Sequence, residues 1–264
     1  MESEVTSHET YQKHFDPKVY LETYFAGESG LLSSDGYMKF MLENMFKIFT
    51  SGEVQGDILI NIGFAPTIYQ LLSACESFTE IIITDFMDQN LQEIESWLKE
   101  EPGAFDWSAV VKHACELEGD REKWSEKEAK VRGTVKRVLK CDVTQSNPLE
   151  PLVLPPADCL LTFLSLEAAC KDRDTFCCAL KNISSLLKPG GDLVMGGLLD
   201  ATNYMVGERK FYSLLLDEEF LKKAIPEAGY ELLQLFTQSH NNPTSLSDYS
   251  AYFFIHARKQ TNTS

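Results

Sequence analysis

Basic residues are scarce in this chain of 264 residues, where 24 lysines and arginines stand against 40 aspartates and glutamates for a net charge of −16. A surface of that sign repels phosphate backbones, which argues against a nucleic acid partner. It favours cationic ligands only weakly, since an acidic balance more often reflects solubility alone. No apolar run approaches the length of a membrane span, so no membrane partner is expected either.

Paired cysteine motifs are also missing. The seven cysteines are an odd number, they lie within apolar stretches, and none belongs to a C-x-x-C pair. This pattern favours reduced, buried thiols over disulfides or a metal site. The polar, acidic start from Met1 to Val5 is typical of neither a signal peptide nor a transit peptide. We therefore expect a cytosolic protein that holds no metal.

A glycine-rich dinucleotide motif is the third missing feature. The apolar run Ile58–Ile62 ends at Gly63, and the following residues Phe64–Pro66 do not continue a G-x-G-x-x-G pattern. A pyrophosphate needs that cradle, so an NAD-dependent oxidoreductase is set aside. An adenosine ligand without a pyrophosphate, such as S-adenosylmethionine, fits the remaining strand, turn and helix pattern.

Alternating strand and helix patterns make up most of the chain, and they favour a parallel sheet with helices on both faces. The expected strands are Ile58–Ile62, Ile81–Thr84, Val138–Cys141, Cys159–Leu164 and Leu193–Met195. The expected helices are Tyr37–Phe49, Pro66–Cys75, Asp88–Glu100, a charged one within Glu116–Lys136, Asp174–Leu187 (closed by Lys188–Gly191) and Glu218–Ala228.

The end of the chain carries two further β-like runs, Tyr230–Phe236 and Tyr249–His256, which can pair as an antiparallel hairpin at one edge. No internal repeat or domain linker is present. We expect a single domain over residues 1–264, with an N-terminal helical lid segment at 1–50 and a loose tail at 259–264.

Polar residues stand where the expected strands end, the place where open α/β sheets bind ligands. Asp85 could accept hydrogen bonds from ribose hydroxyls, Asp142 from an adenine amino group, and Gly63 lets a ligand approach the backbone. Each residue alone is commonly a cap or turn residue. Together, at the expected points of one fold, they predict an adenosine site. The nearby aromatic residues are individually more typical of a core, although a sulfonium is attracted to aromatic faces.

Seven blocks of the sequence carry a resemblance to a known family. These blocks are Thr67–Phe78, Asp88–Glu93, Trp97–Ser108, Val138–Ser146, Leu154–Cys159, Ser185–Gly191 and Tyr204–Gly207. Almost end to end, the chain resembles the small-molecule amine and thioether methyltransferases that include nicotinamide, indolethylamine and phenylethanolamine N-methyltransferases, with most likeness to the nicotinamide branch.

The resemblance implies a Rossmann-like class I methyltransferase fold, with a mostly parallel seven-stranded sheet, an antiparallel edge hairpin and an N-terminal helical lid. It implies a monomer in which S-adenosylmethionine donates a methyl group to a small amine, pyridine or thioether, with no catalytic base assigned. The residues it assigns to the cofactor are Tyr20, Phe25, Gly63, Phe64, Tyr69, Asp85, Phe86, Asn90, Asp142, Val143 and Phe163. The residues it assigns to the acceptor are Tyr24, Gly197, Tyr204 and Ser213.

The first loop departs from the family pattern, which usually reads Asp-Ile-Gly-Ser-Gly-Pro where this chain reads Asn61-Ile-Gly-Phe-Ala-Pro66. Ala65 costs about 1 kcal/mol if that position needs a positive φ. Four other positions also differ from the family: Phe25, Phe86, Phe163 and Gly197. These departures motivate an alternative, a catalytically impaired pseudoenzyme that keeps the fold as a binding or interaction protein.

Overall fold

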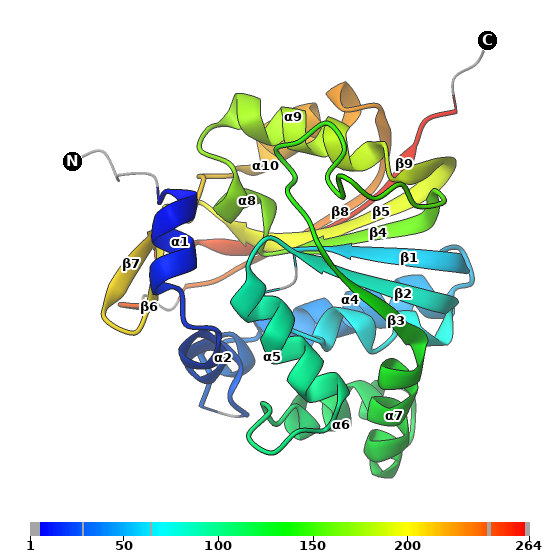
Figure 1. The fold of residues 1–264 in the computed structure, drawn as a ribbon, viewed down its shortest axis with the longest axis vertical. Helices are drawn as coiled ribbons and strands as arrows, with labels where there is room; N and C mark the ends of the chain where they lie inside the picture. The colour runs from blue at the N-terminus through cyan, green and yellow to red at the C-terminus, as the bar shows by residue number, and fades with distance from the viewer. Residues whose placement is uncertain (1–5, 28, 64, 242–243, 262–264) are drawn as a thin grey trace.

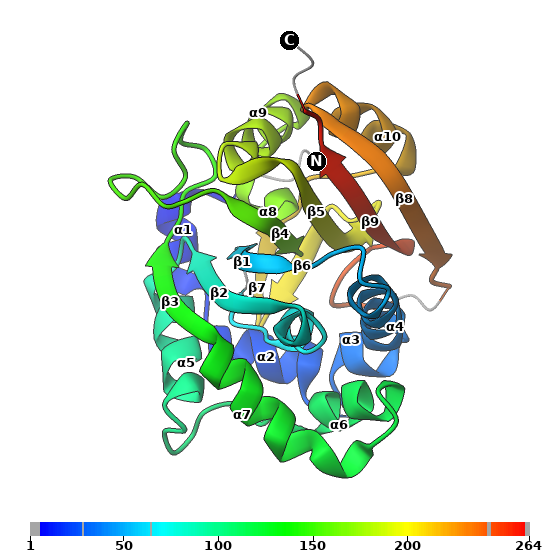
Figure 2. The same ribbon diagram turned by 90° about the vertical axis from the view of Figure 1, so that its right-hand side faces the viewer.

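The computed structural model describes residues 6–27, 29–63, 65–241 and 244–261. Within them, a seven-stranded sheet of order β3-β2-β1-β4-β5-β9-β8 crosses the molecule (Figures 1 and 2). Its strands are β1 (Gly56–Ile62), β2 (Phe78–Asp85), β3 (Val135–Lys140), β4 (Ala157–Phe163), β5 (Leu187–Leu199), β8 (Tyr230–Ser239) and β9 (Ala251–Lys259). From β3 to β5 in this order, adjacent strands are parallel to each other. Strand β9 pairs antiparallel with both β5 and β8.

This arrangement confirms the predicted parallel sheet with an antiparallel hairpin at one edge. Lys259 still pairs with Tyr230 in that hairpin, so β9 extends one residue into the predicted tail. Residues 262–264 of the tail lie outside the described part of the chain.

Helices cover both faces of the sheet (Figure 1). On one face lie α4 (Tyr37–Thr50), α5 (Asp88–Leu98), α6 (Ser108–Leu117) and α7 (Trp124–Thr134). On the other lie α8 (Leu166–Ala169), α9 (Arg173–Ser184) and α10 (Glu218–Glu227). Strand β1 contributes side chains to the apolar cores on both faces of the sheet. Leu59 points to the first face, whereas Ile60 and Ile62 point to the second. Burial on both faces explains why these strands read as continuous apolar runs.

The N-terminal helices are α1 (His8–His14), α2 (Pro17–Phe25) and α3 (Leu31–Ser34). Helix α2 begins at Pro17, after the cap residue Asp16, whose Oδ1 accepts hydrogen bonds from the Lys18 and Val19 amides at 2.9 and 3.2 Å. Its proline occupies the first helical turn, where a missing N–H is harmless. Helices α1 and α2 lie beside the carboxyl ends of the strands, whereas α4 belongs to the layer that packs on the sheet (Figures 1 and 2).

The predicted helix from Pro66 to Cys75 is wrong. The structure has two short 3₁₀ turns there, η1 (Tyr69–Leu71) and η2 (Ala74–Glu76). All residues from 66 to 75 are buried, including the polar residues Thr67, Gln70 and Ser73, so this segment has no solvent-exposed face. An amphipathic helix needs such a face, and tertiary packing therefore overrides the local pattern.

Strand β5 begins at Leu187, six residues before its predicted start at Leu193. It therefore includes Lys188–Gly191, which the sequence predicts as a helix-closing turn. The pairing with β4 shifts register between Ala157 and Cys159, and this irregularity accommodates a proline and two glycines at the strand's beginning.

The charged segment Glu116–Lys136 contains the end of α6, a 3₁₀ turn η3 (Arg121–Lys123) and α7. In this segment Arg132 contacts Glu128 at 3.2 Å, and Lys130 pairs with Glu76 of η2. Helix α6 and the hairpin of β6 (Asn203–Val206) and β7 (Arg209–Tyr212) lie outside the predictions.

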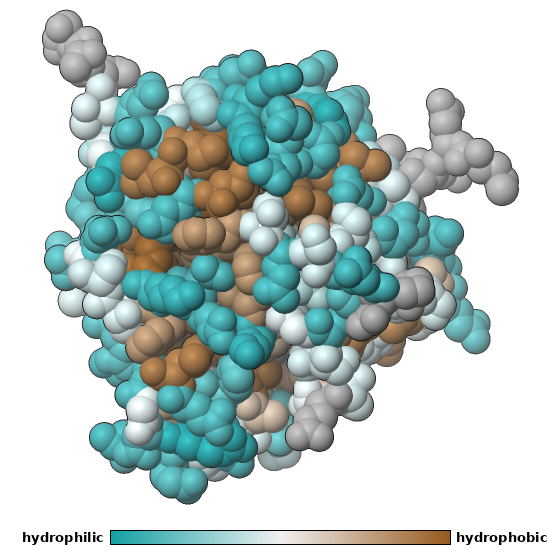
Figure 3. Space-filling view, turned by 180° about the vertical axis from the view of Figure 1, so that it is seen from behind, coloured by the Kyte–Doolittle hydropathy of each residue, from teal (hydrophilic) through white to brown (hydrophobic). Residues whose placement is uncertain are grey.

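Seen from behind, the surface is mainly hydrophilic, with apolar side chains gathered in several separate groups (Figure 3). No helix in the described ranges combines the length and the apolar character that crossing a lipid bilayer requires.

Candidate functional site

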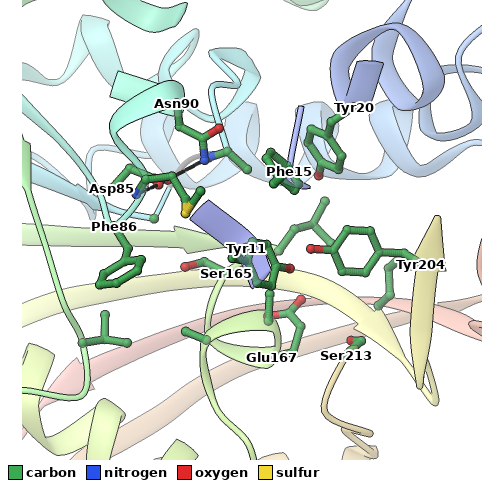
Figure 4. Close-up of a pocket in the computed structure, with 18 of the residues that line it drawn as sticks. Tyr11, Phe15, Tyr20, Asp85, Phe86, Asn90, Ser165, Glu167, Tyr204 and Ser213 are labelled. Carbon is green, nitrogen blue, oxygen red and sulfur yellow. Dashed lines mark hydrogen bonds between the residues drawn. The ribbon is translucent and has the colours of Figure 1, made fainter. Parts of the chain in front are cut away.

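A cavity of about 1170 Å³, measured with the open solvent at its mouth, lies at the carboxyl ends of β1, β2, β3 and β4. The end of β1 and the end of β4 are adjacent here, although their chains continue to opposite faces of the sheet. Such a switch point leaves a crevice in open α/β sheets. Helices α1 and α2 and the β6–β7 hairpin close the cavity from outside (Figure 4).

Asp85 and Asn90 form the polar corner at the end of β2 (Figure 4). Asp85 Oδ1 accepts hydrogen bonds from the Met87 amide at 2.7 Å and from Asn90 Nδ2 at 3.0 Å. The second oxygen, Oδ2, accepts one from the Ala65 amide at 3.2 Å. Asn90 Oδ1 is buried and has no hydrogen-bond partner among the described residues. An unpaired buried acceptor beside a fixed carboxylate suits the hydroxyl donors of a ribose.

Asp142 and Val143 line the cavity just beyond β3. Asp142 Oδ1 accepts hydrogen bonds from the Thr144 amide at 3.0 Å and from its hydroxyl at 2.6 Å. Val143 is buried, and its carbonyl accepts a hydrogen bond from Asn182 Nδ2 at 3.0 Å. The oriented carboxylate can accept a hydrogen bond from the amino group of a purine, and the apolar wall can cover the face of the purine ring.

The turn after β1 is tightly constrained. Gly63 has a φ of 60°, and a Cβ there would overlap the hydroxyl of Ser165 at the end of β4. Only glycine fits both the conformation and the space. Ala65 also has a positive φ, 46°, which meets the condition under which the sequence predicts strain. Leu164, which also lines the cavity, has a φ of 51°. Backbone strain of this kind concentrates at functional sites.

An aromatic wall from two elements faces the strand ends. Tyr20 and Tyr24 come from α2 and Tyr204 from β6. The ring centroid of Tyr20 lies 5.1 Å from that of Tyr24 and 6.4 Å from that of Tyr204. The Tyr24 hydroxyl donates to the Met205 carbonyl at 2.9 Å, which ties α2 to the hairpin. Burial raises the pKa of the Tyr20 hydroxyl well above its usual range, so this wall stays neutral.

The structure brings most of the predicted residues together. Those that line the cavity are Tyr20, Tyr24, Gly63, Asp85, Phe86, Asn90, Asp142, Val143, Tyr204 and Ser213. Phe64 lies outside the described residues.

Phe25, Tyr69 and Phe163 lie behind the cavity wall, in the core. The Phe25 and Tyr69 rings stack at 5.7 Å between centroids, and the Phe163 ring meets Tyr69 edge-on at 6.0 Å. Asn61 is fully buried in β1, and neither of its side-chain polar atoms has a hydrogen-bond partner among the described residues. Gly197, in β5, lies behind the side chain of Glu167.

Glu167 of α8 is the cavity residue that sequence reasoning missed. Its carboxyl is buried, lines the cavity and has an oxygen, Oε1, without a hydrogen-bond partner in the described part of the chain. Burial raises its pKa to about 7, although backbone hydrogen bonds at Glu167 and Ser165 act in the opposite direction. A signal was available in the sequence: a glutamate stands within the apolar stretch that follows β4.

The charges of the cavity share one sign. Its described lining contains three carboxyl side chains, Asp85, Asp142 and Glu167, and no lysine, arginine or histidine. The described residues also contain no cluster of histidine, cysteine and carboxylate side chains suited to a metal ion. The cavity is therefore built for ligands that carry positive charge or hydrogen-bond donors.

Comparison with known proteins agrees with this geometry. The model of the NNMT/PNMT/TEMT family matches residues 2–260. Nicotinamide N-methyltransferase of Homo sapiens is 53% identical over 261 residues, covering 98% of this chain and 98% of that protein. Indolethylamine N-methyltransferase of Mus musculus is 51% identical over 251 residues, covering 95% of each.

Among solved structures, the magnesium protoporphyrin IX methyltransferase of Synechocystis PCC 6803 with bound SAH has a TM-score of 0.59 over 95% of this chain and 96% of that one. At 11% sequence identity, this likeness concerns the fold alone. The family model and the two relatives at about half identity span the chain from end to end, and the chain therefore belongs to the NNMT/PNMT/TEMT family.

Proposed function

We propose that this chain is an S-adenosylmethionine-dependent methyltransferase that transfers a methyl group to a small amine, pyridine or thioether. The observation that carries the proposal is the cavity itself, which places a nucleoside-type polar corner and a cation-attracting lining at the switch point of the sheet. Membership of the family supports the same reading.

The residues divide into two groups by what they offer. At the ends of β2 and β3, Asp85 and Asn90 suit the ribose, and Asp142 with Val143 suits the adenine. Gly63 and Tyr20 border the space beyond the ribose, where the methionine part would extend. On the other side, Tyr24, Tyr204 and Ser213 line the space left for an acceptor.

S-adenosylmethionine, when bound, supplies a methyl group activated by a sulfonium. The chain's own contribution is to orient two ligands in one enclosed space and to exclude water from it. Helices α1 and α2 supply the enclosure, because Tyr11 and Phe15 of the N-terminal segment reach into the cavity. The aromatic rings beside them attract cations by about 0.5–2 kcal/mol each.

Calorimetric titration with S-adenosylhomocysteine tests the proposal directly, followed by methyl transfer from labelled donor. We expect wild-type protein to bind and Asp85→Asn to bind at least tenfold more weakly, because the amide offers one acceptor oxygen instead of two. Asp57→Asn is the matched control, since Asp57 is exposed at the opposite end of β1. Failure of the wild-type protein to bind the nucleoside at millimolar concentration would reject the proposal.

A pseudoenzyme is the second candidate, and a specific observation favours it. The rings of Phe25, Tyr69 and Phe163 pack against one another in the core and present no hydroxyl to the cavity lining, and Asn61 offers no carboxylate. The triple variant Asn61→Asp, Phe64→Ser, Ala65→Gly separates the two. A large gain in donor affinity, together with transfer activity absent from the wild type, identifies the natural chain as the impaired form.

We also expect the chain to act as a monomer in the cytosol. Sedimentation velocity and imaging of the tagged protein check the two expectations.

A further inference from the structure

A cluster of aromatic rings joins the N-terminal helices to the β6–β7 hairpin. Four of its members line the cavity: Tyr11 of α1, Phe15, Tyr20 of α2 and Tyr204 of β6 (Figure 4). The fifth is Phe211 of β7, which is fully buried and does not belong to the described lining. The cluster therefore brings together two parts of the chain that lie far apart in the sequence.

The ring of Phe211 contacts several of the rings that line the cavity. Its centroid lies 5.0 Å from that of Tyr11 and 5.7 Å from those of Phe15 and Tyr204. The planes of Phe211 and Tyr204 differ by 24°, whereas Phe15 meets Phe211 edge-on at 80°. Aromatic pairs at these distances prefer defined orientations, so a ring at position 211 restricts how its neighbours can turn.

The pairing of β6 with β7 fixes Phe211 in this place. Phe211 stands directly opposite Tyr204 in the antiparallel pair, so the two side chains share one face of the hairpin. In the same strand, the Tyr212 amide donates a hydrogen bond to Thr6 Oγ1 at 2.8 Å, which ties the segment before α1 to β7. The hairpin backbone therefore sets the position of Phe211, and the N-terminal segment docks against it.

The ring contacts also form a closed circuit. They continue from Phe15 to Tyr20 at 5.3 Å and from Tyr20 to Tyr204 at 6.4 Å, and Phe211 joins Tyr204 back to Phe15. Because each ring packs between two others, one ring can turn only if its neighbours shift. Removal of the ring at position 211 would open the circuit behind the cavity wall and leave the lining rings free to move.

We propose that Phe211 is a positioning residue for methyl transfer, which holds the rings of Tyr11, Phe15 and Tyr204 in the orientation that aligns the acceptor with the donor. Phe211 acts through these rings, since it does not itself face the cavity. The inference rests on the proposed function and adds to it a residue outside the cavity. Transfer without an assigned base depends on alignment in a closed space, so its rate should be sensitive to the freedom of these rings.

Phe211→Leu tests the proposal, because leucine keeps an apolar side chain in the hairpin but removes the ring. Calorimetry with S-adenosylhomocysteine gives nucleoside affinity and the number of binding sites. Transfer is measured with labelled S-adenosylmethionine and whichever of nicotinamide, tryptamine and tetrahydrothiophene the wild type methylates fastest. We expect kcat per binding site to fall about tenfold or more, within the range that a displacement of about 1 Å costs. Nucleoside affinity should change less than about twofold, because Asp85 and Asn90 belong to β2 and α5.

Phe176→Leu is the matched control. Phe176 is a fully buried phenylalanine of α9 outside the described cavity lining, and its ring lies 5.5 Å from that of Phe220. This variant should lose core packing as Phe211→Leu does, but its kcat per binding site should equal that of the wild type. A merely structural role of Phe211 predicts the same behaviour for both variants, with fewer binding sites and an unchanged kcat at each site.

A double-mutant cycle shows whether Phe211 acts through the lining rings. Phe211→Leu combined with Phe15→Leu should lower kcat by less than the product of the two single effects, since both changes open the same circuit. Phe211→Leu combined with Phe176→Leu should give the full product. Independent effects in the first pair would overturn the proposal, as would an unchanged kcat per binding site in Phe211→Leu.

Hydrogen exchange separates this inference from the proposed function. In Phe211→Leu, the backbone amides of α1 and α2 should exchange about tenfold faster than in the wild type, while those of α5 keep their rate. The measurement needs no ligand, so it judges the ring contacts even where the wild type binds no S-adenosylhomocysteine, the result that rejects the proposed function. Equal exchange of α1 and α2 in the two proteins would show that Phe211 does not hold the N-terminal helices, and the proposal would fall.

Discussion

The two ends of the cavity satisfy their polar groups in different ways. At the nucleoside end, Asp85 and Asp142 are held by backbone amides and neighbouring side chains within the protein. At the acceptor end, Glu167 has an oxygen with no partner in the described chain. The first end is preorganised before any ligand arrives, whereas the second depends on a ligand to complete it. A fixed nucleoside corner and an incomplete acceptor corner suit an enzyme with one cofactor and a selective second substrate.

Gly63→Ala should cause the largest loss of nucleoside affinity. Position 63 lies at the preorganised end of the cavity. The new methyl group would overlap Ser165 Oγ, and the positive φ of 60° disfavours any side chain. We expect S-adenosylhomocysteine affinity to fall more than a hundredfold and the free energy of unfolding to fall by about 1–3 kcal/mol. Calorimetry and urea unfolding measure the two quantities. Gly133→Ala, in α7 with open space around it, is the control that should bind normally.

Glu167→Gln should change how stability depends on pH. The folded-state pKa of about 7 lies above the ordinary value of 4.5, so the folded protein binds one proton more than the unfolded chain between these pH values. Stability conferred by the protonated carboxyl is complete below pH 4.5 and is lost as pH rises through 7. At about 1.4 kcal/mol per pH unit, the loss is about 3 kcal/mol.

Glutamine does not titrate, so the free energy of unfolding of the variant, relative to that of the wild type, should rise by that amount between pH 4.5 and pH 8. Urea unfolding of both proteins across this range measures the difference, in which all other groups cancel. If the difference between the two unfolding free energies stays constant with pH, Glu167 ionises normally and the acceptor end is already complete in the free protein.

Ala65→Gly should have a smaller effect, and it should raise stability and nucleoside affinity instead of lowering them. The positive φ of 46° costs alanine about 1 kcal/mol or more, offset in part by the greater freedom of glycine in the unfolded chain. We expect the unfolding free energy to rise by up to about 1 kcal/mol and nucleoside affinity to rise severalfold. Unchanged stability would show that the backbone relaxes at this position.

Thr144→Val should have the smallest effect. It removes the hydroxyl that donates to Asp142 Oδ1 at 2.6 Å but keeps the amide that donates to the same atom. We expect S-adenosylhomocysteine affinity to fall no more than about fivefold, the range of one neutral hydrogen bond. A loss as large as that of Gly63→Ala would place the main support of the nucleoside end at β3 instead of β1.

The sequence predicts that Gly63, Asp85 and Asp142 lie together at one end of the cavity, because these residues follow strands in fixed positions. Gly63, Asp85 and Asp142 each come directly after an apolar run, and parallel strands bring their carboxyl ends together. The edge hairpin is predictable for a similar reason, since two β-like runs lie close together in the chain. Local pattern and tertiary structure agree at these positions.

The acceptor end could not be predicted in the same way. Glu167 and Gly197 lie 30 positions apart in the sequence, and they come close together only because β5 passes behind α8 in the folded chain. The buried segment from 66 to 75 and the β6–β7 hairpin were likewise decided by packing instead of local periodicity. The positions of Phe25, Tyr69 and Phe163 behind the wall also depend on contacts between distant elements.

The hydroxyl of Tyr24 connects parts of the cavity surroundings that lie far apart in the sequence. It donates to the carbonyl of Met205 and lies 3.1 Å from that of Leu246, and it accepts from the Met205 amide at 3.2 Å. A single phenol thus links α2 to the β6–β7 hairpin and to the segment before β9, and we expect ligand exchange to be slower while these hydrogen bonds hold. We expect Tyr24→Phe to shorten residence times in stopped-flow measurements while entry quickens as well, leaving equilibrium affinity nearly constant. Unaltered exchange kinetics would place the gate elsewhere.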